Sequence, residues 1–321
     1  MATYGKEVMT DEEREAARKR KPELTLWDFA NPRGPWVLVP EGSLMGYFDW
    51  VPKHLRVGPW SLLAPLYLAA LCGFVIYMKP PEIGLMFANE PSPYPQPYSP
   101  LWCYNLIGFF WMIFVLYLLR GGGMFIFCTY TIQSWTMMTV RHGLSALAPF
   151  LSQGHPLLLL HDILKFPVLA TATVTFFVWN TVLMPFILFY AHGKDPKRRK
   201  QFLGWCFNFR MSQIHLFNVL YAVLNTVSSQ QNFTDKDLWC ALVGMLLYGL
   251  FYVLVLDRIG CHLYPVFSPR TWAFGLTWSF VIGCYFGVYG AWNKLITDGT
   301  LSNLVSELLR NSESAFFRGL Q

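Results

Sequence analysis

The sequence predicts an all-α fold, a polytopic transmembrane helical bundle of about seven spans (six to eight) with its N-terminus inside. Three observations predict it. The 321 residues are 54% hydrophobic and only 14% charged, which is too apolar for a soluble globular protein of this length. Several apolar segments reach the roughly 20 residues that a spanning helix needs. The basic residues gather in alternate connections, as they do in the inner loops of membrane proteins.

Seven segments are candidate spans by length and apolar character. They cover residues 60–78, 101–119, 124–150, 161–190, 211–227, 238–256 and 271–292. The fifth segment is short for a span and the fourth is long, so counts of six and eight stay open.

The distribution of Lys and Arg sets the orientation. With seven spans, "REAARKRK", Arg120, "KDPKRRK", Arg258 and Arg270 all fall on one side of the membrane. The other side receives "PPEIGLMFANEPSPYPQPYSP", "LSQGHP" and "SSQQNFTDKD", which are poor in basic residues. Because short basic loops stay inside, the pattern favours an inside N-terminus and an outside C-terminus.

Four parts follow one another along the chain. Residues 1–59 form a polar, aromatic-rich N-terminal extension, and residues 60–100 add one transmembrane helix and a Pro-rich loop. Residues 101–292 form the main helical body, and residues 293–321 a polar C-terminal tail. The N-terminal residues have neither the apolar core of a secretory signal nor the acid-poor composition of a transit peptide.

The cysteines give no sign of a disulfide framework or of a zinc site, since the seven are spread over the apolar segments without a CxxC pair. We therefore predict no metal and no cofactor. Membrane lipids are the expected partners, and nothing in the sequence points to nucleic acid.

The stretch Phe125–Val140, "FIFCTYTIQSWTMMTV", carries an unusual number of hydroxyl groups for a membrane segment. Of the seven histidines, only His215 falls well inside a predicted span, whereas His142 and His161 fall near span ends. Thr129 and His215 each follow the inner end of a span by five residues, which places both roughly 8 Å into the membrane. An imidazole that takes the proton of an alcohol makes it a nucleophile. The structural alternative is that these hydroxyls bond carbonyls one turn back and pack helices.

Four stretches in order, "FCTYTIQSW", "LKFPVLATATVTFFVWNTV", "GWCFNFRMSQIHLFNVLYAVLN" and "LFYVLVLDRIGCHLYPVFSPRTW", carry a family resemblance. Together they resemble the androgen-induced gene and androgen-dependent tissue-factor-pathway-inhibitor-regulating proteins, a family of membrane threonine hydrolases. The resemblance runs over about residues 101–292. It implies hydrolysis of lipid esters, including fatty acid esters of hydroxy fatty acids, without a metal. Thr129 would be the nucleophile, His215 the catalytic histidine, and Tyr264 and Pro265 a turn at a helix exit.

One departure affects the histidine. The family has a compact Asn-His-x-Met-His pattern, whereas "NFRMSQIH" has Phe209 at the first histidine position and three extra residues before His215. An ungapped alignment places Ser212 at the catalytic position instead. Three residues are nearly one helical turn, so His215 still points the same way.

Two functions stay open. The first is a membrane threonine hydrolase of lipid esters, in which Gln133 and Asn180 are candidates for oxyanion binding or support. The second is a non-catalytic accessory subunit of a large membrane complex, for example a mitochondrial respiratory assembly, which the N- and C-terminal extensions would contact. A transporter is disfavoured because the spans lack paired interrupted helices and intramembrane carboxylates.

The membrane also stays open between the endoplasmic reticulum and the mitochondrial inner membrane. Asn232 in "NFT" is a glycosylation sequon on the predicted outer side, which would fit an endomembrane protein.

Overall fold

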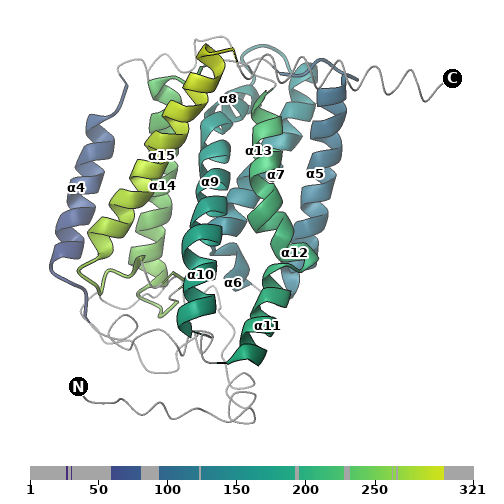
Figure 1. Ribbon diagram of the computed structural model, residues 1–321. Helices are drawn as coiled ribbons and strands as arrows, with labels where there is room; N and C mark the ends of the chain where they lie inside the picture. Colours follow the sequence, from purple (N-terminus) through teal and green to yellow (C-terminus); the bar gives the residue numbers. More distant parts are fainter. Residues whose placement is uncertain are drawn as a thin grey trace, which may run out of the picture. The chain divides into compact units, whose positions relative to one another are not determined.

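The computed structural model describes residues 27, 30, 59–80, 94–122, 124–191, 195–227, 232–261, 263, 264 and 267–299 (Figure 1). Its regular elements are all helices, so the predicted all-α class is confirmed. Nearly all of the predicted N-terminal extension, much of the Pro-rich loop, the tail beyond residue 299 and Pro265 lie outside the described residues.

Four helical stretches are long and apolar enough to cross a membrane, which indicates a membrane-embedded protein. They are Pro100–Leu119, Pro156–Phe189, Asp235–Leu256 and Phe274–Thr297. The first is α5 (Pro100–Leu119), and the last is α15 (Phe274–Thr297). The apolar helix α4 (Leu63–Tyr77) has 15 residues, fewer than the roughly 20 that a straight span needs. The count of about seven spans stays a prediction.

The third predicted span is interrupted, whereas the fifth lies in one continuous helix whose hydrogen bonding changes from α to π and back. The third contains α6 (Met124–Phe127), α7 (Tyr130–Leu147) and the short helix η3 (Ala148–Phe150). The fifth contains α12 (Phe209–Ser212), η6 (Gln213–Phe217) and α13 (Asn218–Val227). Side-chain caps mark the break in the third span and the start of the helix that holds the fifth. Thr129 caps α7 in an extended conformation, and the Asn208 side chain accepts from the Met211 amide to cap α12.

The fourth predicted span is one long, distorted helical stretch. It begins with α8 (Pro156–Ile163) and α9 (Lys165–Phe177). It then alternates between the π-helix η4 (Val178–Leu183), the α-helical turn α10 (Met184–Phe186) and the π-helix η5 (Ile187–Ala191). Pro185 lacks the amide hydrogen that an α-helix needs at this point, which explains a local change of hydrogen bonding.

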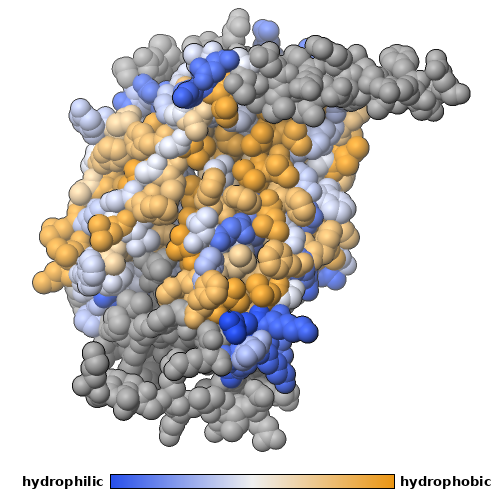
Figure 2. Space-filling view, viewed as in Figure 1, coloured by the Kyte–Doolittle hydropathy of each residue, from blue (hydrophilic) through white to orange (hydrophobic). Residues whose placement is uncertain are grey.

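Most of the basic segment "KDPKRRK" belongs to α11 (Pro196–Cys206), a polar helix whose N-terminus is capped by a side chain. The carboxylate of Asp195 accepts hydrogen bonds from the amides of Lys197 and Arg198, at 3.0 and 3.1 Å. Pro196 occupies the first helical position, where its missing N–H has no partner to lose. Figure 2 shows hydrophilic residues gathered at α11, below a surface that is largely hydrophobic around α9 and α13.

The chain divides into two compact units. One comprises Met1–Ala69 with Gly249–Thr277, and the other comprises Ala70–Tyr248 with Trp278–Gln321. The helix α14 (Asp235–Phe251) continues as the π-helix η7 (Tyr252–Leu256), so its last turns belong to the first unit.

A buried ion pair organises the first unit. Arg270 donates from Nε and Nη2 to the two carboxylate oxygens of Asp257, at 3.1 and 2.9 Å, and both side chains have 0% exposure. Trp60 donates from its indole to the same carboxylate at 2.8 Å. Nearby in the sequence, the hydroxyl of Tyr252 donates to the carbonyl of Tyr264 at 2.8 Å. Arg270, which the sequence analysis counted among the inner charges, is therefore held inside the protein by a carboxylate.

The second unit is built from packed helices, α5 on α7, α7 on α9, and α9 on α13 (Figure 1). Polar side chains join neighbouring helices. Trp135 of α7 donates to the Met112 carbonyl of α5 at 3.2 Å, and Asn218 of α13 donates to the Ala172 carbonyl of α9 at 3.1 Å. Gly108 of α5 is also needed here, because a Cβ at that position would lie 2.7 Å from the His142 ring.

Candidate functional site

His215 lies where two π-helical segments meet. It belongs to η6 and is only 5% exposed. Its imidazole stacks on the indole of Trp179 in η4, with ring centroids 4.0 Å apart and planes inclined by 16°. π-helical segments are rare and are frequent at functional sites, so the meeting of two of them at a buried histidine singles out this region.

Asn180, a predicted oxyanion or support residue, holds the backbone at His215. Its side-chain amide donates to the carbonyl of Phe176 at 2.7 Å and to the carbonyl of His215 at 3.2 Å. An asparagine amide has two N–H donors, so these bonds use both. The geometry therefore favours the supporting role over oxyanion binding.

Thr129 is a helix cap in this structure. Its hydroxyl accepts from the Ile132 amide at 3.2 Å and donates to the Ile126 carbonyl at 2.8 Å. The element it caps, α7, packs against η6. Within the described residues no hydrogen bond joins Thr129 to His215. Catalysis by this pair would require the Thr129 hydroxyl to leave the Ile126 carbonyl.

The remaining predicted residues lie on the same elements. Gln133 is half-buried, one turn along α7, and its amide reaches the Phe127 carbonyl only at 3.5 Å. Ser212 is half-buried and directly precedes η6, where its side chain makes no capping bond. The Nδ1 atom of His215 is buried and has no hydrogen-bond partner among the described residues.

Several other hydroxyls of α7 bond to carbonyls one turn back or to hydroxyls of neighbouring helices. Thr136 and Thr139 donate to the carbonyls one turn back, each at 2.8 Å. Ser134 donates to the Thr171 hydroxyl of α9 at 2.9 Å, and Tyr130 and Tyr285 share a hydrogen bond of 2.6 Å. Helix packing accounts for these hydroxyls, as the structural interpretation proposed.

A second polar cluster, which the sequence analysis missed, is centred on Arg141 of α7. Arg141 is completely buried and donates from Nη1 to the side-chain oxygen of Asn225 in α13. The Asn225 amide donates to Asn105 of α5 at 2.5 Å and to Ser145 of α7 at 3.2 Å. Ser145 in turn shares a 2.9 Å hydrogen bond with Nε2 of His161 in α8. We call these five residues the Arg141 network.

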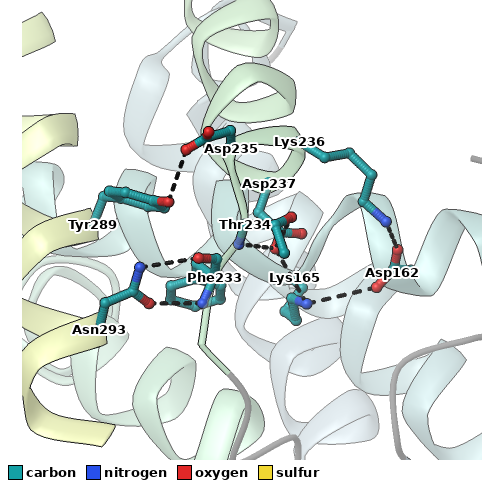
Figure 3. A network of polar contacts seen from close by, with 9 residues as sticks. All are labelled: Asp162, Lys165, Phe233, Thr234, Asp235, Lys236, Asp237, Tyr289 and Asn293. Atoms are coloured by element: carbon teal, nitrogen blue, oxygen red, sulfur yellow. Dashed lines mark hydrogen bonds and ion pairs between the residues drawn. The ribbon is translucent and has the colours of Figure 1, made fainter. Parts of the chain in front are cut away.

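Next to His161 in the sequence, Asp162 belongs to a cluster of charged residues on α8, α9 and α14, which Figure 3 shows. Asp162 contacts the ammonium groups of Lys236 at 2.5 Å and of Lys165 at 3.7 Å. Lys165 also contacts Asp237 at 3.3 Å. Asp162, Lys165 and Asp237 have 7%, 4% and 1% exposure, so this ion cluster lies largely inside the protein.

The same end of α14 is held to α15 by further contacts (Figure 3). Asn293 accepts from the Phe233 amide at 2.7 Å and donates to its carbonyl at 2.9 Å. Tyr289 donates to Asp235 at 3.1 Å, and Asp237 accepts from the amide and hydroxyl of Thr234.

The missed cluster had a signal in the sequence. Arg141 falls inside the third predicted span, and an ionisable residue in a span is a functional candidate by default. His142 and His161, placed near span ends, are 0% and 2% exposed. Asp162 and Asp237 are buried carboxylates within helical stretches long enough to span a membrane. The lack of such carboxylates therefore no longer counts against a transporter.

No family model, curated protein or solved structure matches this chain. The resemblance to the membrane threonine hydrolases therefore stays a prediction, carried by the four sequence stretches alone.

Proposed function

We propose that this chain is an integral membrane hydrolase that cleaves lipid esters with a Thr129–His215 pair. The observation that carries the proposal is the setting of His215. Its ring is oriented by Trp179, its backbone carbonyl is held by Asn180, and its buried Nδ1 has no partner among the described residues. A buried polar atom of this kind calls for an explanation, and a proton-transfer role is one.

In the proposed reaction, Oγ1 of Thr129 attacks the ester carbonyl carbon while its proton passes to the imidazole of His215. The oxyanion intermediate then expels the alkoxide, which takes that proton and leaves as the alcohol. Water next attacks the acyl-threonine, His215 receives the proton of this water, and the carboxylic acid departs as the threonine hydroxyl re-forms.

The supporting residues have separate roles in this scheme. Asn180 positions His215 through its backbone, since both of its amide donors are engaged. Gln133 is the proposed oxyanion donor, because it lies one turn along α7 from Thr129. The hydrogen bond from its side-chain amide to the Phe127 carbonyl is long, so that amide is available to another acceptor.

Substitutions at Thr129 separate its capping from its chemistry. Thr129→Asn keeps a good helix cap and removes the hydroxyl, whereas Thr129→Ser keeps both. His215→Phe keeps an aromatic ring on Trp179 and removes the base. We expect purified Thr129→Ser to hydrolyse a fluorogenic long-chain ester, and Thr129→Asn and His215→Phe to lose at least about 100-fold of the wild-type rate. Equal rates in wild type and Thr129→Asn would remove the nucleophile assignment.

The accessory-subunit alternative rests on the N- and C-terminal extensions, most of which lie outside the described residues. No contact in the described part favours it over the enzyme. If purified wild type has no esterase activity, the alternative predicts that the chain co-purifies with a membrane complex. The same co-purification would distinguish the endoplasmic reticulum from the mitochondrial inner membrane, because the proteins of the complex would identify the membrane.

A further inference from the structure

Arg141 carries a buried positive charge that no described carboxylate pairs with. Its side chain has 0% exposure, and within the described residues its polar contact is with an amide oxygen, that of Asn225. Its Nε atom is buried without a hydrogen-bond partner there. A guanidinium does not lose its proton in a protein, and an uncompensated buried charge is costly.

The neighbouring carboxylates are already engaged by lysines. Asp162 contacts Lys236 and Lys165, and Asp237 contacts Lys165. These carboxylates act on Arg141 electrostatically without touching it. The third carboxylate at this end of α14, Asp235, is exposed and accepts from Tyr289.

His161 supplies a second buried nitrogen without a partner among the described residues. The Ser145 hydroxyl accepts from Asn225, and the tautomer of His161 sets the direction of the bond between Ser145 and Nε2; in one tautomer Ser145 donates and Nε2 accepts. In this tautomer the proton of His161 is on Nδ1, and that buried atom also has no partner among the described residues. In this tautomer, two N–H donors of one hydrogen-bonded network have no acceptor among the described residues.

We propose that the Arg141 network binds a monovalent anion, either a small inorganic anion such as chloride or the carboxylate of a lipid. Its charge would balance Arg141, and its lone pairs would accept from the unpartnered nitrogens of Arg141 and His161. This site is separate from the proposed hydrolase pair, since Arg141 lies twelve residues along the chain from Thr129, or about 18 Å at the rise of an α-helix.

The test is the thermal unfolding of the purified full-length protein in nonionic detergent, followed by tryptophan fluorescence. Sodium gluconate, whose anion is large and hydrated, is compared with sodium chloride at equal ionic strength. Sodium oleate is added to the gluconate sample in a separate series, with oleyl alcohol as its uncharged control. At about ten times the dissociation constant, the bound anion should raise the Tm by roughly 3 °C.

Three variants tie the shift to Arg141. Arg141→Gln should lose it, whereas Arg210→Gln, the same change at an exposed arginine, should keep it. Asn225→Asp places a carboxylate at the atom that Arg141 contacts, so it should replace the added anion and also abolish the shift. If Arg141→Gln does not fold, Asn225→Asp and the wild type still decide.

The two sources of the anion give different results. A shift with chloride alone assigns an inorganic anion, and a shift with oleate but not oleyl alcohol assigns a lipid carboxylate. A wild-type Tm that is the same in gluconate, chloride and oleate overturns the proposal, and so does a shift that persists in Asn225→Asp.

Discussion

The imidazole of His215 lies almost flat on the indole of Trp179, with 4.0 Å between the ring centroids. The two residues come from η6 and η4, and each helix departs from α-helical hydrogen bonding at this point. A stack fixes the plane of the imidazole while its nitrogen atoms stay at the ring edge. This arrangement suits a residue that must present a nitrogen in one direction.

Removing the indole should therefore lower activity as well as stability. For Trp179→Ala we expect an unfolding free energy about 2–3 kcal/mol lower, because the half-buried indole loses its packing together with its aromatic contact. We expect the rate constant of ester hydrolysis to fall on the order of tenfold, because the imidazole is no longer held in position. Measured kcat and KM values should show the loss in kcat. Trp179→Phe, which keeps an aromatic ring, should lie close to wild type, and an unchanged kcat in Trp179→Ala would separate the stack from catalysis.

The buried Asp257–Arg270 pair should be far more sensitive to neutralisation than an exposed pair. Asp257→Asn leaves the Arg270 charge buried without its partner, which typically costs about 3–5 kcal/mol. The control is Asp195→Asn, whose pair with Arg198 is 44% and 39% exposed and whose capping role asparagine retains. That change should cost about 1 kcal/mol or less. Denaturant unfolding in detergent measures both, and equal losses would contradict the assigned burial.

Gly108 should not tolerate even one methyl group. In Gly108→Ala the new Cβ would meet the buried His142 ring, whose Nδ1 lies 2.9 Å from the Met138 carbonyl, so the ring cannot move away freely. We expect an unfolding free energy about 1–3 kcal/mol lower. Gly244→Ala is the matched control, because nothing lies within 4 Å of its Cβ and α14 should gain helix propensity. The two Tm values should move in opposite directions.

The sequence predicted the helical class and the apolar segments well, because both follow from composition and length. It did not predict the breaks inside them. Thr129 occurs within an apolar run, and only the backbone shows that it ends one helix and caps the next. The π-helical segments at Trp179 and His215 have six and five residues, too few for a distinct periodicity to be recognised in the sequence.

The sequence singled out some residues of the polar sites and missed others. Asn180 does lie against His215, 35 positions away in the sequence. The comparison of membrane depths covered only Thr129 and His215, so it did not predict this contact. Asn225 and Asn105 were missed because single amides in apolar spans look like ordinary helix-packing residues. The bond between them, and the bond from Arg141 to Asn225, depend on three helices meeting, which one sequence does not reveal.

The most direct test of the proposed function is to locate a covalent adduct. Purified wild type is treated with a fluorophosphonate probe, digested and mapped by mass spectrometry, beside Thr129→Asn and His215→Phe. We predict an adduct on the peptide that contains Thr129, with no adduct there in either variant. A folded wild type without any adduct, or an adduct on another residue such as Ser145, would contradict it.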